Sequence, residues 1–374
     1  MAISTQADSA TSSRISRLLS RSLVKPMVTP LVPGDFLELV NPLRFGRGLR
    51  GRIEQVLSET ADARTLVIRP GRGWRAHRAG QFVSIGIDIK GVRHSRCYSI
   101  SSAPERADGC FSITVKAVDG GRVSTHLVRE AQTGMLIHLS PAEGEFVLPS
   151  VSADPLLFVT AGSGITPIMS MLRSLAARDA MTDAVLIHYA PTPADCIFAD
   201  ELRALAERFP QLRVHLVNTR ATGDAALSGH FSTAHLEQVC SDWQTRQAYA
   251  CGPRALLATL DAIWSQAGVA ERLQVERFQA ALAPANAGAV GGEVRFSRSG
   301  RLAQADGAKP LLEVAEAAGL APAHGCRMGI CHGCMVTLKS GCVRDLRSGH
   351  IHRDSGELVQ ICVCAAAGDV EIEL

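Results

Sequence analysis

Closely spaced cysteines near the C-terminus form the strongest chemical pattern in the chain. Cys326, Cys331 and Cys334 lie in CRMGICHGC with the spacing C-x4-C-x2-C, and Cys362 and Cys364 follow in ICVC. This spacing is typical of a [2Fe–2S] cluster, because one loop carries three thiolates to two irons and a distant segment supplies the fourth. The glycines of the loop leave it without bulk, so backbone amides can point at the sulfurs and stabilise the reduced cluster.

Zinc is the competing interpretation of these cysteines. Structural zinc sites usually combine two CxxC pairs, whereas this segment has one pair and an x4 gap. A Rieske centre needs two histidine ligands, and His332 alone does not supply them. The remaining alternative is that the cysteines only fill the core. The spacing favours iron–sulfur chemistry.

A second set of motifs lies in the first half of the chain. RCYSISSAP, residues 96–104, matches R-x-Y-S-x-x-S, and GRVSTHL, residues 121–127, matches G-x-x-S-x-x-L. The first motif offers an arginine for a pyrophosphate, a ring to lie against a flavin and a hydroxyl to hydrogen-bond it. The second places backbone amides at a helix start, where they bind phosphate oxygens. The alternative is that Tyr98 is a half-buried strand residue and Arg96 a surface charge.

A third set of motifs begins with LLFVTAGSGITPIMSMLR, residues 156–173, which predicts a buried strand, a glycine turn and a helix. Gly162 and Gly164 let the backbone approach a ligand, with Thr166 as the helix N-cap and Pro167 as the first helical residue. Such a helix N-terminus favours a pyrophosphate. The full G-x-G-x-x-G fingerprint is absent, so the turn alone is a weak signal.

Together these motifs resemble the ferredoxin–NADP reductase superfamily, whose CGP turn and E-x-F ending match ACGP at 250–253 and VERF at 275–278. The resemblance implies FAD and NAD(P)H as cofactors, with Ser99 near flavin N5 and Cys251 near the nicotinamide as the catalytic contacts. For Cys251 the alternative is a small core residue. The implied cofactor-binding residues are Arg96, Tyr98, Ser99, Arg122, Val123, Ser124, Gly162, Gly164, Thr166, Pro167, Cys251, Gly252, Glu276 and Phe278.

The choice between NADH and NADPH depends on cations near the ends of the second or third strand of the nucleotide domain, which can bind the 2′-phosphate. The segment PTPADC after AVLIHYA has no arginine, whereas Arg220 directly follows RVHLVNT. The sequence therefore slightly favours NADPH, with Arg220 as the phosphate ligand.

The cysteine segment resembles the plant-type ferredoxin domain that many bacterial reductases carry at their C-terminus. Those domains end in a cysteine, a few residues, an acid and an alternating strand, here CVCAAAGDVEIEL. Aligning Asp369 with that ending makes Cys362 the fourth ligand, whereas the usual gap length favours Cys364. We expect Cys362, because loop length varies more easily than the register of a final strand. The predicted metal ligands are Cys326, Cys331, Cys334 and Cys362.

The fold expected around these motifs is multidomain, α+β and α/β. Short alternating runs from RIEQVLSE to GEFVLP predict an antiparallel β-barrel FAD domain over 48–150. Strands alternating with helices predict a parallel-sheet α/β nucleotide domain over 151–280. The small-residue stretch 281–290 is typical of a linker. A hairpin, a short helix and the cysteines make up 291–374, which the resemblance implies is a β-grasp ferredoxin domain.

Residues 1–47 form an N-terminal extension in this scheme. Residues 1–24 are rich in Ser and Arg and lack the apolar core of a secretory signal, so we interpret them as a tail, with an organelle transit peptide as the alternative. Residues 25–45 are Pro-rich and apolar, and they would pack on a domain or touch a membrane-bound partner.

The composition excludes several classes of function. Of 374 residues 46% are apolar and 20% charged, and the net charge is +3, which fits folded domains and gives no reason to expect a nucleic acid partner. No run approaches the ~20 apolar residues of a membrane-spanning helix. Eleven cysteines, an odd number, favour a reducing compartment. We expect a cytoplasmic protein, with peripheral contact at the inner face of the membrane.

The order of the three domains resembles single-chain reductases that feed oxygenases and desaturases. It implies electron transfer from NAD(P)H through FAD and [2Fe–2S] to a separate acceptor protein, because NAD(P)H gives two electrons and a cluster takes one at a time. NPLRF and CRMGICHGC look most like reductases of bacterial acyl-CoA (stearoyl-CoA) desaturases, so a membrane fatty-acyl desaturase is the expected acceptor. The alternatives are a ring-hydroxylating dioxygenase, a P450 or a hybrid-cluster protein, and, in another class, a redox-sensing regulatory module.

Overall fold

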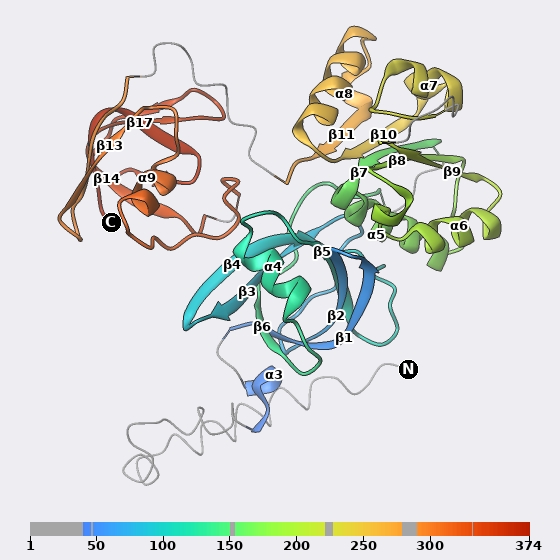
Figure 1. Cartoon of the computed structure of the whole chain (residues 1–374), viewed down its shortest axis with the longest axis horizontal. Helices are drawn as coiled ribbons and strands as arrows, with labels where there is room; N and C mark the ends of the chain where they lie inside the picture. The colour runs from blue at the N-terminus through green and yellow to red at the C-terminus, as the bar shows by residue number, and fades with distance from the viewer. Residues whose placement is uncertain (1–39, 46–47, 150–153, 221–226, 279–289, 331) are drawn as a thin grey trace, which may run out of the picture.

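The computed structural model describes residues 40–45, 48–149, 154–220, 227–278, 290–330 and 332–374. These residues form three sheets, each with its own helices and core (Figure 1). Nearly all of the predicted N-terminal extension and of the predicted linker 281–290 lies outside the described residues, so these domain boundaries stay predictions.

The first sheet is an antiparallel barrel. Its order is β4-β3-β6-β1-β2-β5, and an isolated bridge between Ile100 and Ile113 joins the chain after β4 to β5. Alternate side chains of the strands point inward and form the barrel core, to which helix α4 adds Val123 and Leu127. The elements are α3 (Pro42–Phe45), β1 (Arg50–Thr60), β2 (Ala63–Pro70), β3 (Phe82–Ile89), β4 (Val92–Ser99), β5 (Phe111–Lys116), α4 (Arg122–Arg129) and β6 (Leu136–Leu139).

Two local predictions for this barrel need correction. GEFVLP, residues 144–149, is not a strand. Its Phe146 and Leu148 are buried in a core shared with Phe158 of the next domain, so the segment is apolar because it fills the contact between domains. Conversely, the sequence analysis did not single out β4 as a strand, because most of its residues are polar. In the structure most of them are only half buried.

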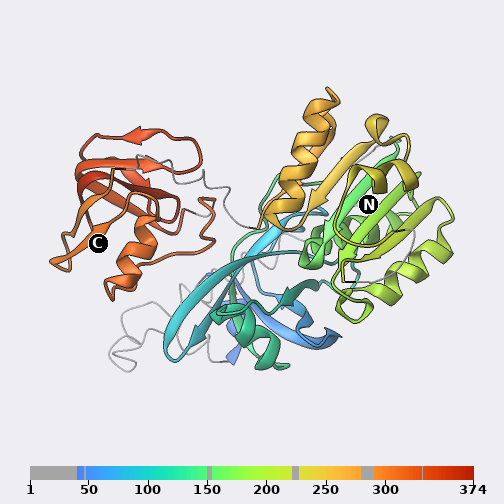
Figure 2. The same ribbon diagram turned by 45° about the horizontal axis from the view of Figure 1, so that its top comes forward.

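The second sheet is parallel, with the order β11-β10-β7-β8-β9. Helices α5 and α6 lie on one face and α7 and α8 on the other, each over its own core (Figures 1 and 2). The α/β pattern read from the sequence is confirmed. The elements are β7 (Leu156–Ala161), η2 (Gly162–Gly164), α5 (Ile165–Ala177), β8 (Ala184–Ala190), η3 (Pro193–Asp195), α6 (Ala199–Arg208), β9 (Leu212–Asn218), α7 (Thr233–Val239), η4 (Trp243–Thr245), β10 (Gln247–Cys251), α8 (Arg254–Gln266), η5 (Ala270–Arg272) and β11 (Leu273–Glu276).

The third sheet belongs to a ferredoxin-type domain with the order β13-β12-β17-β14-β15, while β16 pairs with β14. β12 and β17 are parallel and the other pairs antiparallel. The predicted hairpin and helix are present, and the helix buries Leu311, Leu312 and Val314 against the sheet. The elements are β12 (Gly292–Phe296), β13 (Arg301–Ala305), α9 (Leu311–Ala317), β14 (Met335–Asp345), β15 (Ile351–His352), β16 (Leu358–Gln360) and β17 (Cys364–Ile372).

A side chain at Gly164 should disrupt the contact between the glycine turn and β10. A Cβ there would overlap the carbonyl oxygen of Cys251, and neither backbone can easily yield. We expect Gly164→Ala to lower the free energy of unfolding by about 3 kcal/mol. Urea titration followed by the fluorescence of Trp243 and Trp264, which pack in this domain with ring centroids 4.5 Å apart, measures the effect.

Gly162→Ala is the matched control for this prediction. Gly162 has a φ of +54°, but a Cβ added to it would meet no other atom of the described residues within 4 Å. Only backbone strain of about 1 kcal/mol should therefore result. Equal losses in the two variants would contradict the proposed close approach.

Candidate functional site

Three of the predicted cluster ligands come together at one end of the ferredoxin-type domain. Cys326 lies in the loop between α9 and β14, Cys334 directly precedes β14, and Cys362 lies in the turn before β17. All three are buried. The thiols of Cys334 and Cys362 share a hydrogen bond, which lowers the pKa of Cys334 to about 7, and Cys326 is close enough to act on both by charge. Cys331 lies outside the described residues.

The loop around Cys326 fits a cluster rather than a packed core. The backbone amides of Met328 and Ile330 donate to Cys326 Sγ at 3.3 and 3.4 Å, as the sequence analysis predicts for a loop that stabilises a negatively charged cluster. Arg327 and His332 have positive φ values of 58° and 54°. Strained backbone of this kind persists only where the surroundings impose it.

Two side chains that the sequence analysis missed hold this loop in place. Arg347 Nη1 and Gln360 Nε2 both donate to the carbonyl oxygen of Gly329 at 3.0 Å. Gly329 has a φ of +73°, which favours glycine, and a Cβ there would push against Arg347 Nη1. Asp345 fixes Arg347 in turn through an ion pair of 2.6 Å. No motif could have revealed these residues, because the sheet brings them together from distant positions.

Cys364 has different surroundings from Cys362. It is the first residue of β17 and is buried, and its sulfur lies within 4.8 Å of ligand-type atoms of Asp345 and His352. Burial and the nearby Asp345 raise the pKa of Cys364 to about 12. The contacts of Cys362 with Cys334 therefore favour Cys362 as the fourth ligand, which stays a prediction.

The predicted flavin residues Arg96, Tyr98 and Ser99 lie on β4, where the barrel meets the nucleotide domain. Ser99 is 4% exposed, and its Oγ donates to Glu276 Oε2 of β11 at 3.2 Å. Cys251, at the end of β10, places its Sγ 4.0 Å from the same carboxylate oxygen. Residues predicted from three separate motifs thus meet at one point between two domains. Tyr98 is largely buried on the same strand, and burial raises its pKa above the usual range.

The carboxyl group of Glu276 is the electrostatic centre of this meeting point. Burial raises its pKa to about 8, although the hydrogen bond from Ser99 acts in the opposite direction. Burial and the neighbouring Glu276 raise the pKa of the Cys251 thiol as well. Both groups are therefore protonated near neutral pH, which suits a site that receives hydride beside a flavin rather than one that needs a thiolate.

Arg96 lies between the barrel and the cluster loop. Its Nη1 donates to the carbonyl oxygen of Ser95 at 2.7 Å and to that of Gly325 at 3.5 Å. Burial lowers the pKa of Arg96, and the charge of the nearby Arg327 adds to that effect. The predicted role of Arg96 at a pyrophosphate stays a prediction, while its contact with the cluster loop is a feature that the sequence analysis missed.

The start of α4 fits phosphate binding. Gly121 is the N-cap, and the first backbone bond of the helix runs from Thr125 N to Gly121 O at 3.1 Å. The amides of Arg122, Val123 and Ser124 precede that bond, so they have no acceptor within the helix. The Ser124 hydroxyl itself is engaged locally, because it accepts from the amide of Val118 at 3.3 Å.

The nucleotide turn differs from its prediction in one respect. Gly164, not Thr166, is the N-cap of α5, and Thr166 Oγ1 donates to the carbonyl oxygen of Ser163 at 2.9 Å. The 3-10 turn Gly162–Gly164 leads directly into the helix, so the helix begins earlier and Pro167 is its third residue. Proline is tolerated there, since the first four amides have no acceptor within a helix.

The remaining predicted residues lie at the edges of this domain. Gly252 packs close to Ala161, which brings the CGP turn against the end of β7. Phe278 is 37% exposed beyond β11. Arg220 is exposed after β9, and its amide donates to the carbonyl oxygen of Pro191 at 3.0 Å. The backbone of Arg220 thus lies beside the loop that follows β8, and its contact with a 2′-phosphate stays a prediction.

Three protein families match segments of this chain. They are described as the oxidoreductase FAD-binding domain, at residues 61–148, the oxidoreductase NAD-binding domain, at 158–261, and the 2Fe-2S iron-sulfur cluster binding domain, at 295–367. The matches fall on the barrel, the parallel sheet and the cysteine-bearing sheet in the order that the motifs predict.

Similar proteins cover three quarters of the chain or more. An NADPH oxidoreductase of Mycobacterium tuberculosis is 44% identical over 95% of this chain and 92% of its own length. A glycine betaine monooxygenase reductase subunit of Pseudomonas aeruginosa is 30% identical over 75% of this chain and 82% of its own. The solved structure of phthalate dioxygenase reductase, at 24% identity, covers 87% of this chain and 97% of that one with a TM-score of 0.59, which is a likeness of fold.

Serine substitutions of Cys362 and Cys364 should show which of the two cysteines is the fourth cluster ligand. We expect Cys362→Ser to lose most of the iron and the cluster's visible absorption, because its thiol contacts Cys334. Cys364→Ser should keep both, since that side chain lies beside Asp345 and His352 instead. Iron content and absorption per protein measure the outcome. Loss of iron in Cys364→Ser alone would assign the fourth ligand to Cys364.

The raised pKa of Glu276 predicts a specific pH dependence of stability. The carboxyl group keeps its proton up to about pH 8 in the folded protein and loses it near 4.5 when unfolded, so its contribution to stability is complete below pH 4.5 and is lost as the pH rises towards 8. The unfolding free energy of the wild type minus that of Glu276→Gln should fall by at least about 1 kcal/mol between pH 5 and 8. A difference that stays flat between pH 5 and 8 would contradict the prediction.

Proposed function

Since this chain belongs to the family of ferredoxin reductase-type oxidoreductases that join FAD-binding, NAD-binding and 2Fe-2S domains, we propose that it passes electrons from NADPH to a separate oxygenase. FAD and the [2Fe–2S] cluster are the intermediate carriers. FAD supplies the step from paired to single electrons when it is bound. The redox-sensing module, considered from the sequence, has no support among the relatives, which are named as oxidoreductases and reductase subunits.

The position of β4 is the observation that carries this proposal. At one end, Ser99 contacts Glu276 of the nucleotide domain at 3.2 Å, and three residues earlier Arg96 reaches Gly325 of the cluster loop at 3.5 Å. A single strand therefore touches the segments predicted to bind nicotinamide and cluster. Electron transfer from nicotinamide through the flavin to the cluster requires such proximity. A chain in which the three domains worked separately would not require it.

The residues at the first contact have roles that follow from their chemistry. Ser99 and Cys251 would orient the reacting rings, because both are buried and both lie next to the Glu276 carboxylate. Glu276, with its pKa of about 8, can hold a proton at its carboxylate and exchange it through the Ser99 hydroxyl. Cys326, Cys334 and Cys362, with Cys331, would hold the cluster.

The names of several relatives favour an oxygenase as the acceptor. They include reductase subunits of glycine betaine monooxygenase and of stachydrine N-demethylase, and a ferredoxin reductase component of 3-ketosteroid-9-alpha-monooxygenase. The alternative considered from the sequence was a ring-hydroxylating dioxygenase, a P450 or a hybrid-cluster protein. The oxygenases in this alternative are thus better supported than a desaturase. A membrane fatty-acyl desaturase remains the second candidate, because NPLRF and CRMGICHGC resemble desaturase reductases and the name of the M. tuberculosis relative specifies no acceptor.

The proposed nucleotide is NADPH. Arg220 lies beside the loop after β8, where a cation can bind the 2′-phosphate, and the relative from M. tuberculosis is named as an NADPH oxidoreductase. An NADH oxidoreductase of Escherichia coli is 29% identical over 75% of this chain, so family membership alone does not decide the nucleotide, and the proposal depends on Arg220.

The proposed place of work is the cytoplasm, and a desaturase acceptor would add contact with the inner face of the membrane. Among the residues that the structure describes, no helix has the length and apolar character needed to cross a membrane.

Reconstituted protein should reduce cytochrome c with NADPH faster than with NADH. In Cys326→Ser the rate of cytochrome c reduction should fall by at least about tenfold, whereas the rate of ferricyanide reduction should be kept. Ferricyanide takes electrons well from the flavin without the cluster, and cytochrome c does not. Cys342→Ser, in the same domain and only partly buried, is the control and should keep both activities.

The same preparation decides between the acceptors. A purified Rieske-type monooxygenase should turn over with the reductase and NADPH, and membranes that contain an acyl-CoA desaturase should not. Turnover of the desaturase alone would replace the oxygenase proposal by the second candidate. Failure of cytochrome c reduction by the reconstituted wild type would remove both.

A further inference from the structure

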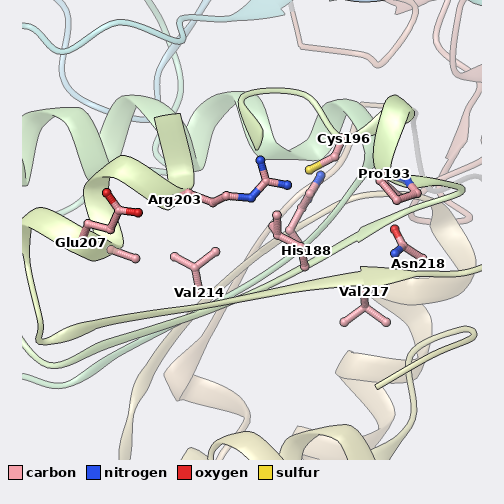
Figure 3. A pocket seen from close by; sticks show the side chains of 11 residues that line it. His188, Pro193, Cys196, Arg203, Glu207, Val214, Val217 and Asn218 are labelled. Carbon is pink, nitrogen blue, oxygen red and sulfur yellow. The ribbon is translucent and has the colours of Figure 1, made fainter. Parts of the chain in front are cut away.

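A groove in the nucleotide domain is not used by the proposed electron path. It lies between α6 and the sheet at β8 and β9, and its volume is about 520 Å³. We name it the α6 groove. Figure 3 shows its lining side chains, with His188 from β8, Val214 from β9, and Arg203 and Glu207 from α6. A volume of this size is in the range of small-molecule pockets.

The α6 groove contains a buried polar atom without a partner. His188 is 0% exposed, and its Nδ1 shares a hydrogen bond of 2.8 Å with Thr160 Oγ1. Its Nε2 has no hydrogen-bond partner among the described residues, and the ring lines the groove. Buried polar atoms are nearly always satisfied, so an unpartnered nitrogen at the wall of a cavity points to a ligand atom there. Burial lowers the pKa of His188 to about 4, which keeps the ring neutral.

A cation lies at the same end of the α6 groove. In Figure 3 the guanidinium of Arg203 extends from α6 toward His188 and the thiol of Cys196. Arg203 forms an ion pair of 2.7 Å with Asp200, whose side chain is fully exposed. Exposed ion pairs of this kind contribute little, so Arg203 can exchange Asp200 for a ligand. A planar guanidinium next to a neutral imidazole matches a carboxylate, which accepts from both.

The rest of the α6 groove combines apolar side chains with Glu207 and Asn218, and one end of it leads away from the carboxyl edge of the sheet. β9 is the edge strand of the sheet, and α6 covers its Val214 and Leu216 only partly. Ala206 is the small residue of α6 that leaves room above them. Val214 lies near the start of β9, whereas dinucleotides bind outside the carboxyl ends of parallel strands. The groove therefore runs along the sheet, from Val214 to Ala190 and Asn218 at the carboxyl ends of β8 and β9.

We propose that the α6 groove binds a small amphipathic monocarboxylate. Its carboxylate lies between the guanidinium of Arg203 and Nε2 of His188, and its hydrocarbon chain lies on Val214 and Leu216 below Ala206. The site is separate from the nicotinamide contact at Cys251. It is nevertheless connected to that contact through the sheet, because Thr160, the partner of His188, pairs in register with Cys251.

Octanoate is a suitable probe, and the holoprotein with FAD and cluster is the species to titrate. Calorimetry should detect octanoate binding, and octan-1-ol should bind at least about tenfold more weakly, because it lacks the charge that Arg203 recognises. Arg203→Met should weaken octanoate binding to a similar extent. Arg208→Met is the control on the same helix, since its guanidinium lies over Phe209 with 4.7 Å to the ring centroid, and it should leave binding unchanged.

A second pair of variants tests the apolar part without changing charge. Ala206→Leu fills the space above Val214 and Leu216 and should abolish octanoate binding, whereas Ala204→Leu, on the exposed side of α6, should not. Equal binding of octanoate and octan-1-ol, or unchanged binding in both Arg203→Met and Ala206→Leu, would overturn the proposal. Displacement of octanoate by 2′,5′-ADP would overturn it as well, because the groove would then belong to the dinucleotide.

Discussion

The arrangement of the candidate site depends on β4 being shared by two neighbours. An edge strand of a barrel has an unpaired side, and here the order β4-β3-β6-β1-β2-β5 leaves β4 at that position. The chain after β4 is joined to β5 by one backbone bridge and by side-chain hydrogen bonds of Ser101 and Ser102. The polar residues of β4 are therefore free to contact other domains. Ser99 contacts β11 and Arg96 contacts the cluster loop. A hydrophobic, fully paired strand could not make both contacts.

The contact between β4 and the nucleotide domain explains why Glu276 and Cys251 keep their protons near neutral pH. A carboxyl group buried between two domains is costly when charged, and Glu276 avoids the cost by holding its proton up to about pH 8. The Cys251 thiol beside it stays neutral for the same reason. A stable interface would be easier to build from apolar residues. Polar residues at this point are consistent with a site that is completed by a flavin and a nicotinamide.

Sequence patterns predicted the structural elements that depend on neighbouring residues in the chain. Buried strands, amphipathic helices and the glycine turn were found because periodicity and turn residues act over a few positions. The prediction of a strand for GEFVLP was wrong and the polar strand β4 was not singled out, because contacts between domains, not local propensity, decide the burial of these segments. The N-cap of α5 moved from Thr166 to Gly164 since a 3-10 turn starts the helix early. Arg347 and Gln360 could not be found at all, because a sheet brings them to Gly329 from positions that share no motif.

The surroundings of the cysteines limit the side by which electrons can leave. Cys362 and Cys364 lie next to the packed core of the ferredoxin-type sheet, and on that side Val359, Ile361 and Val363 are buried. Ile330 and Met335, which are next to ligand cysteines in the sequence, are 42% and 37% exposed. Exposed apolar side chains beside a redox centre suit contact with another protein. An acceptor that contacts the loop around the ligand cysteines would cover these two exposed side chains.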